Sequence, residues 1–105
     1  MSDNFLTDVP KVSIAHLIDN VVDEGRALNL TCTANGNPPA MILWKKLGLE
    51  ETLISKKQGH SGHVVEQLEF DPIQKKDNGT YMCQAKNAIG VSKDKLVEIK
   101  VRGEY

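Results

Sequence analysis

The sequence predicts an all-β domain folded as a sandwich of two antiparallel sheets. Short runs of alternating apolar and polar residues recur along the chain, and no stretch keeps the i, i+3, i+4, i+7 spacing of an amphipathic helix. Clusters of Gly, Pro, Asn and Asp separate these runs and mark turns. The only two cysteines both fall on predicted inward faces of strands, which suits one disulfide across two sheets.

The amino-terminal half contains the clearest alternation. Residues 26–34 form a predicted strand with one apolar face, and Asn29 lies on its polar, solvent-facing side. A turn at residues 35–39 leads into a strand at residues 41–46, because Gly permits positive φ and each Pro removes a backbone donor. Trp44 faces inward from this second strand. The inward residues of the first strand are Leu28, Leu30, Cys32 and Ala34.

The two less regular segments are predicted to form edge strands. Residues 9–18 supply the first strand, which Pro10 confines to a sheet edge. Between residues 47 and 63 we expect one or two short edge strands near residues 52–56 and a turn at residues 59–62.

The carboxyl-terminal half repeats the alternating pattern. Leu68 and Phe70 face inward before Pro72 ends their strand, and Ile73 closes the bottom of the core. Glu66 would also face inward, so we expect a strand start or a bulge beside it. A central strand at residues 79–86, a turn at residues 87–90 and a last strand through residues 97–101 complete the sheets. The inward residues of the last two strands are Tyr81, Cys83, Ala85, Val97, Ile99 and Val101.

The bulk composition describes one soluble domain without a charge bias. The chain has 105 residues and a formal net charge of -1, so neither nucleic acid nor an anionic membrane is an expected partner. No apolar run reaches the roughly 18 residues of a membrane span, and residues 1–8 lack the apolar core of a signal peptide. We assign residues 9–102 to the domain and residues 1–8 to a flexible segment, and favour an excised domain over a native start at Met1.

Spacing around the cysteines carries a family resemblance. Trp44 follows Cys32 by twelve residues, and the later segment reads Leu68-x-Phe70-x-x-Ile73-x-x-x-Asp77-x-Gly79-x-Tyr81-x-Cys83-x-Ala85-x-Asn87-x-x-Gly90. This pattern resembles the immunoglobulin superfamily, and it covers nearly the whole chain. The short separation of Trp44 from Leu68 leaves no room for the extra hairpin of a variable-type domain, so the chain is similar to the I-set. The resemblance implies an immunoglobulin-like Greek-key sandwich.

The resemblance also implies roles for the core residues. A Cys32–Cys83 bridge closes a 51-residue loop, which stabilises the fold by about 4 kcal/mol on the chain-entropy model. Trp44 packs on this bridge, and the Tyr81 hydroxyl reaches the backbone of the preceding turn, which Asp77 and Gly79 shape.

Catalysis and metal binding are not predicted. Asp77 and Glu66 are not fixed beside each other, and no nucleophile or phosphate-loop motif is present. His60 and His63 have metal-like spacing, but they lie in a Gly-rich loop, and His16 is distant. We therefore expect no enzyme activity, metal or cofactor.

Two sequons are candidate glycosylation sites, beginning at Asn29 and at Asn78. Asn29 meets the need for exposure on its strand. Asn78 is equally suited to a structural role in the turn.

The outward faces of the two predicted sheets differ. One is polar, whereas the other presents an apolar cluster of the kind that marks an interaction site, unless the loop at residues 47–58 covers it. The cluster residues are Met41, Leu43, Met82 and Leu96.

The leading functional hypothesis is a recognition module in an extracellular adhesion molecule or receptor. Such a module would bind a protein partner or a second copy, adjoin other immunoglobulin-type domains and make no membrane contact itself. The alternative is an intracellular structural domain of a muscle or cytoskeletal filament protein, because function is grafted onto this fold.

Overall fold

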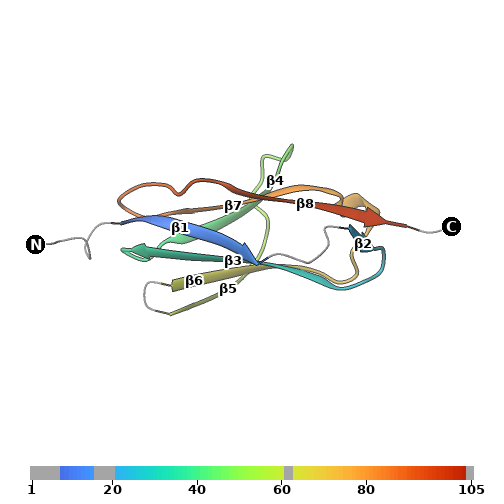
Figure 1. The fold of residues 1–105 in the computed structure, drawn as a ribbon, viewed down its shortest axis with the longest axis horizontal. Helices are drawn as coiled ribbons and strands as arrows, with labels where there is room; N and C mark the ends of the chain where they lie inside the picture. Colours follow the sequence, from blue (N-terminus) through green and yellow to red (C-terminus); the bar gives the residue numbers. More distant parts are fainter. Residues whose placement is uncertain (1–7, 16–20, 61–62, 104–105) are drawn as a thin grey trace, which may run out of the picture.

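The computed structural model describes residues 8–15, 21–60 and 63–103, which form eight strands in two packed layers (Figure 1). One 3-10 turn, η1 (Lys75–Asp77), precedes the seventh strand. The strands are β1 (Asp8–Ala15), β2 (Val21–Asp23), β3 (Leu28–Asn37), β4 (Met41–Lys46), β5 (Lys56–His60), β6 (His63–Phe70), β7 (Gly79–Lys86) and β8 (Lys95–Arg102).

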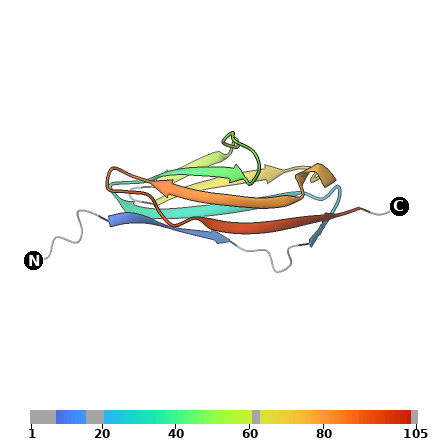
Figure 2. The ribbon, with the colours of Figure 1, turned by 90° about the horizontal axis from the view of Figure 1, so that it is seen from above.

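Each layer is a four-stranded sheet, with the strand orders β1-β3-β6-β5 and β2-β8-β7-β4. Neighbouring strands are antiparallel except for β2, which pairs in parallel with the end of β8. The expected all-β immunoglobulin-like sandwich is confirmed. The amino-terminal region contributes to both sheets, because β1 pairs with β3 and β2 pairs with β8 (Figure 2).

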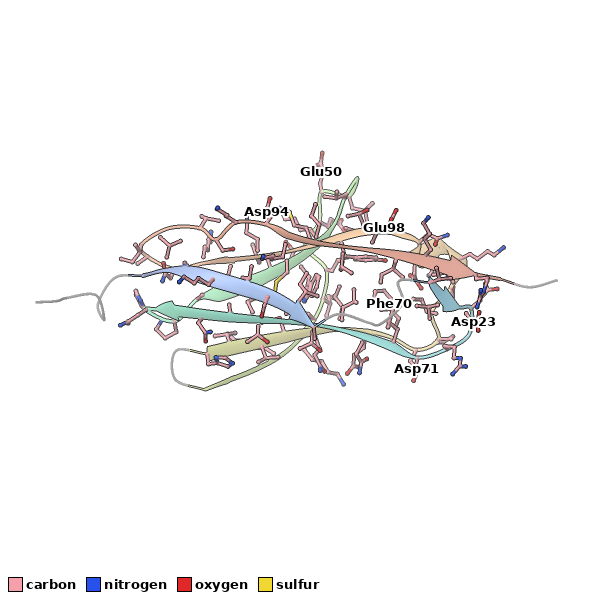
Figure 3. The ribbon with its side chains drawn as sticks, viewed as in Figure 1. Asp23, Glu50, Phe70, Asp71, Asp94 and Glu98 are labelled. Atoms are coloured by element: carbon pink, nitrogen blue, oxygen red, sulfur yellow. A yellow bond between two sulfur atoms is a disulfide. The ribbon has the colours of Figure 1, made fainter. Side chains whose placement is uncertain are left out.

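The core lies between the layers and follows the alternation of the strands. Leu30, Trp44 and Ile73 are completely buried, as are both cysteines. Phe70 lies between the two sheets near the end that holds β2 (Figure 3). Apolar side chains from β3, β4, β6, β7 and β8 therefore share one core, which stabilises the sandwich mainly through burial of apolar surface.

The expected strand start or bulge at Glu66 is wrong. β6 pairs with β3 in unbroken register from His63 to Phe70, so the Glu66 side chain faces inward and is only 8% exposed. The hydroxyl of Ser55 donates a hydrogen bond to its carboxylate. This partner reduces the cost of burying the acid and allows the strand to continue.

The expected edge strands are partly misplaced. The strand after β4 is β5, and Thr52 forms only an isolated bridge with Lys45. Gly59 and His60 belong to β5 instead of a turn, and residues 61 and 62 lie outside the described residues. β1 begins at Asp8 and ends at Ala15, so the remainder of the expected first strand, like residues 1–7, also lies outside them.

Candidate protein-interaction surface

The disulfide joins the two sheets at the centre of the core. Cys32 lies on β3 and Cys83 on β7, and the structure links them. Trp44 is the direct partner of Cys83 on the neighbouring strand β7. Its indole Nε1–H donates to the backbone oxygen of Glu66, in the opposite sheet, at 3.0 Å. Leu68 is 4% exposed two residues further along β6. Trp44 thus ties β4 to the opposite sheet while satisfying its own polar group.

Tyr81 lies in a hydrogen-bonded corner below the disulfide. Its hydroxyl donates to the backbone oxygen of Asp77 at 2.6 Å, and its ring contacts Phe70 edge-on at 5.6 Å between centroids. The Lys46 ammonium lies 5.7 Å from the ring centroid. Burial, together with the negative charge of Asp77, raises the pKa of Tyr81 to about 12. The phenol therefore remains a neutral hydrogen-bond donor at physiological pH.

The turn before β7 uses polar side chains to close its backbone. The Asp77 carboxylate accepts from the Gln74 backbone N–H at 2.8 Å, and the Asn78 side-chain oxygen accepts from the Val101 N–H at 2.5 Å. Gly79 has φ +150, which favours glycine, and an added Cβ would lie 2.7 Å from the Lys46 Cε. Asp77, Asn78 and Gly79 therefore have structural roles in this turn.

The Asn29 side chain lies on the solvent face of β3. Asn29 is exposed and pairs with Glu69 of β6. Two residues on, the Thr31 hydroxyl accepts from the Gln67 amide at 3.1 Å on the same face. This outer face of the first sheet is polar.

The outer face of the second sheet carries the apolar side chains. Met82 lies at its centre on β7, paired with Lys45 of β4 on one side and with Leu96 of β8 on the other. Leu43 pairs with Gln84, one step further along β7, so it is a diagonal neighbour of Met82. Met41 continues the same face of β4. The apolar face is defined here as Met41, Leu43, Met82 and Leu96.

Exposure within the apolar face is graded. Met41 and Leu96 are 55% and 54% exposed, so the loop after β4 does not cover them. Leu43 and Met82 are partly buried. Asp94 accepts a hydrogen bond from the Gln84 amide at 2.8 Å, and Asp94 and Glu98 lie along the outer side of β8 (Figure 3). Polar groups therefore border an apolar centre, as in many protein interfaces.

The loop after β4, which was the expected alternative cover for this face, projects beside it instead. Gly48, with φ +96, forms a tight turn closed by the Leu49 N–H and the Lys46 oxygen at 3.0 Å. Glu50 points away from the sandwich at the tip (Figure 3). Gly48 followed by the charged pair Glu50 and Glu51 was the sequence signal for a turn at this point. We define the projecting loop by its exposed residues Leu47, Leu49, Glu50 and Glu51, and include the exposed Ile54 that directly follows its base.

The histidines do not form a metal site within the described residues. His63 Nδ1 contacts the Asn35 side-chain oxygen, and no group of three metal-ligating side chains occurs in residues 8–15, 21–60 and 63–103. His16 lies outside these ranges. Over the same residues, no helix has the length and apolar character to cross a membrane.

Comparison with known proteins defines the family. The profile of the immunoglobulin domain matches residues 10–87, and the chain therefore belongs to the immunoglobulin domain family. It is 31% identical over 98 residues to the cell adhesion molecule DSCAML1 of Gallus gallus, covering 86% of this chain and 5% of that protein. It is 42% identical over 71 residues to the human leucine-rich repeat and immunoglobulin-like domain-containing nogo receptor-interacting protein 1, covering 66% of this chain and 11% of that protein.

Solved structures are similar in fold. The complex of Dpr2 Ig1-Ig2 with DIP-Theta Ig1-Ig3 contains a chain that matches with a TM-score of 0.71 and 19% identity, over 93% of this chain and 33% of that one. A chain in the complex of titin M10 with an obscurin-like 1 immunoglobulin domain matches with a TM-score of 0.64 and 24% identity, over 81% and 86%. The chain thus spans a small part of the sequence relatives, and its fold is similar to that of chains in both complexes.

Proposed function

We propose that this domain is a non-catalytic protein-recognition module in a cell-surface or secreted adhesion molecule or receptor, and that it binds through the apolar face. The single observation that carries the proposal is the contrast between the two outer faces. Met41 and Leu96 are more than half exposed, and Leu96 pairs with the partly buried Met82, whereas the face around Asn29 is polar. Several apolar side chains converging on one sheet face are typical of an interaction site, and Met adapts well to varied partners.

An extracellular location is supported by the disulfide. Structural disulfides persist in oxidising compartments and are rare in the cytosol. Similarity to a cell adhesion molecule agrees with this location. Asn29 lies on the face opposite the proposed contact, so a glycan there would leave the apolar face accessible. Asn78 is the second candidate, since an attached glycan would occupy the nitrogen and leave the oxygen to accept from Val101.

The alternative is a structural domain of an intracellular filament protein. The similarity to a domain from the titin M10 complex concerns the fold alone. The thiol state of the cysteines and the modification of Asn29 in native material must therefore distinguish the two proposed functions. Native material with free thiols at Cys32 and Cys83 and with unmodified Asn29 would favour the filament protein. A closed bridge together with a glycan at Asn29 would exclude it.

We also infer that residues 9–102 form one domain among neighbouring immunoglobulin-type domains. The relatives support a longer parent protein, because the matched region is 5% of one and 11% of another.

The proposed contact is tested by placing a charge in the apolar face. Leu43→Asp and Met82→Lys, made separately, should weaken binding of the partner that coprecipitates with the parent protein by at least about tenfold, because a charge would be desolvated at the interface. Thr33→Asp, on the outer face of the other sheet, is the matched control. Circular dichroism and thermal melting establish that each variant folds, and surface plasmon resonance measures binding. Wild-type affinity in both folded variants would contradict the proposal.

A further inference from the structure

A basic groove lies on the edge of the sandwich opposite the projecting loop. It has a volume of about 690 Å³ and runs between β1 and the segment that enters β8. Lys11 lines one wall, and Lys93 and Lys95 line the other. All three side chains are exposed, and none has a carboxylate partner within the described part of the chain. Asp94 also lines the groove, and it keeps its negative charge while its Oδ1 accepts from the Gln84 amide. Three lysines and one aspartate leave the groove with a net positive charge.

The same groove has exposed apolar side chains beside its lysines. Val9 is 42% exposed and Val91 is 52% exposed, one from each wall. A suitable occupant therefore combines carboxylates with aliphatic side chains. A sulfated glycan would match the lysines and leave the valines without an apolar partner.

The projecting loop has this complementary chemistry. Glu50 and Glu51 are exposed beside three aliphatic side chains, of which Leu47 is 52%, Leu49 54% and Ile54 96% exposed. The base of the loop is fixed by the Lys45–Thr52 bridge and by the Leu53 N–H, which donates to the Trp44 oxygen at 2.8 Å. The two ends of the loop are thus fixed, and docking would mainly order its tip.

The two surfaces cannot meet within one copy. The loop follows β4, at one edge of the second sheet, whereas β1 and the start of β8 lie at the opposite edge (Figure 2). We propose that the projecting loop of one copy docks in the basic groove of a second copy, which gives a heterologous side-by-side contact. Because the two surfaces differ, each added copy presents a free loop and a free groove, and the contact extends into rows. This contact is separate from the apolar face and does not depend on it.

A single loop in a groove buries less surface than a stable interface, so the contact is weak. We expect a dissociation constant on the order of 0.1 to 1 mM. Sedimentation equilibrium of the folded chain at concentrations up to about 1 mM, in low salt, should show progressive self-association. Raising the salt to about 0.5 M should weaken it, because exposed charges are screened.

Charge reversal tests the pairing directly. Glu50→Lys with Glu51→Lys, or Lys93→Glu with Lys95→Glu, should each lower the association constant at least about tenfold. An equimolar mixture of these two variants should associate again, because opposite charges then meet at both contacts. Glu24→Lys with Asp71→Lys makes the same net change as the loop variant elsewhere on the exposed surface and should retain wild-type association.

Each measurement has a result that would contradict the loop-in-groove contact. A wild-type chain that stays monomeric, loop or groove variants that associate normally, or a mixture that fails to recover would overturn the proposal. The proposal would also be overturned if the chain does not self-associate and a heparin oligosaccharide shifts the amide resonances of residues 91–95. That result would assign the groove to a polyanion. The loop variant should bind the partner that coprecipitates with the parent protein with wild-type affinity, so failure of the apolar face and failure of the groove are distinguishable.

Discussion

At the scale of single residues, Tyr81 shows how one polar atom in the core is satisfied. Tyr81 is 2% exposed, and its hydroxyl donates a hydrogen bond to the backbone oxygen of Asp77. The resemblance to immunoglobulin domains indicated this contact, because a Tyr two residues before the second Cys is the corner residue of that family. Glu66 is the opposite case, because nothing in the local pattern indicated that Ser55 would lie beside its carboxylate.

Tyr81→Phe should destabilise the domain by about 1 kcal/mol or somewhat more, because the Asp77 oxygen loses its hydroxyl donor. Urea titration of the free energy of unfolding measures the effect. The pKa of Tyr81 is raised from 10.0 to about 12, so its contribution is complete below pH 10 and is lost as the pH rises toward about 12. The difference between wild type and variant should therefore shrink over that interval. A neutral substitution at pH 7 would remove the corner from the account of stability.

At the scale of elements, the segment from β4 to β5 is fixed at its two ends and free at its centre. Thr52 bridges to Lys45, and Ser55 bonds to Glu66, whereas Glu50 projects into solvent. Sequence alternation predicted strands here four residues too early, because the strand pairing of β5 depends on β6 and is not a local property. The edge strand β5 also begins with Lys56 and Lys57, charges that discourage pairing with another chain.

Ser55→Ala should destabilise the domain by about 1.5 to 3 kcal/mol, because the buried Glu66 carboxylate loses a hydroxyl donor. In a Glu66→Gln background the same substitution should cost less, because a neutral amide oxygen depends less on this partner. Chemical denaturation of the wild type, both single variants and the double variant gives the coupling between the two side chains. Additive effects would mean that the hydrogen bond does not stabilise the segment.

At the scale of the whole molecule, the disulfide and Trp44 join two sheets that are otherwise held by apolar contact. The bridge connects strands 51 residues apart, so it restricts the unfolded chain strongly. The apolar face depends on this scaffold, since its residues come from strands that meet only in the folded state.

Cys32→Ala or Cys83→Ala should destabilise the domain by about 2 to 5 kcal/mol, because the bridge no longer restricts the unfolded chain. Thermal melting with and without reductant gives the same comparison without a substitution, and Trp44 fluorescence reports whether the core around the bridge loosens. An equal Tm under both conditions would show that the bridge does not contribute.

The sequence by itself determined the all-β class, the inward-facing residues of the main strands, the cysteine pair and the Tyr81 corner. Each depends on period-two alternation or on short spacings, which are local properties of a chain. Only the tertiary structure decided the regular course of β6 through Glu66, the position of β5, the projecting loop and the basic groove. The course of β6, the position of β5 and the groove depend on contacts between segments distant in sequence, whereas the loop is held by contacts between its own two ends. No local sequence pattern predicts that the Ser55 hydroxyl lies beside Glu66. Nor does one predict that lysines from β1 and from the segment entering β8 line the same groove.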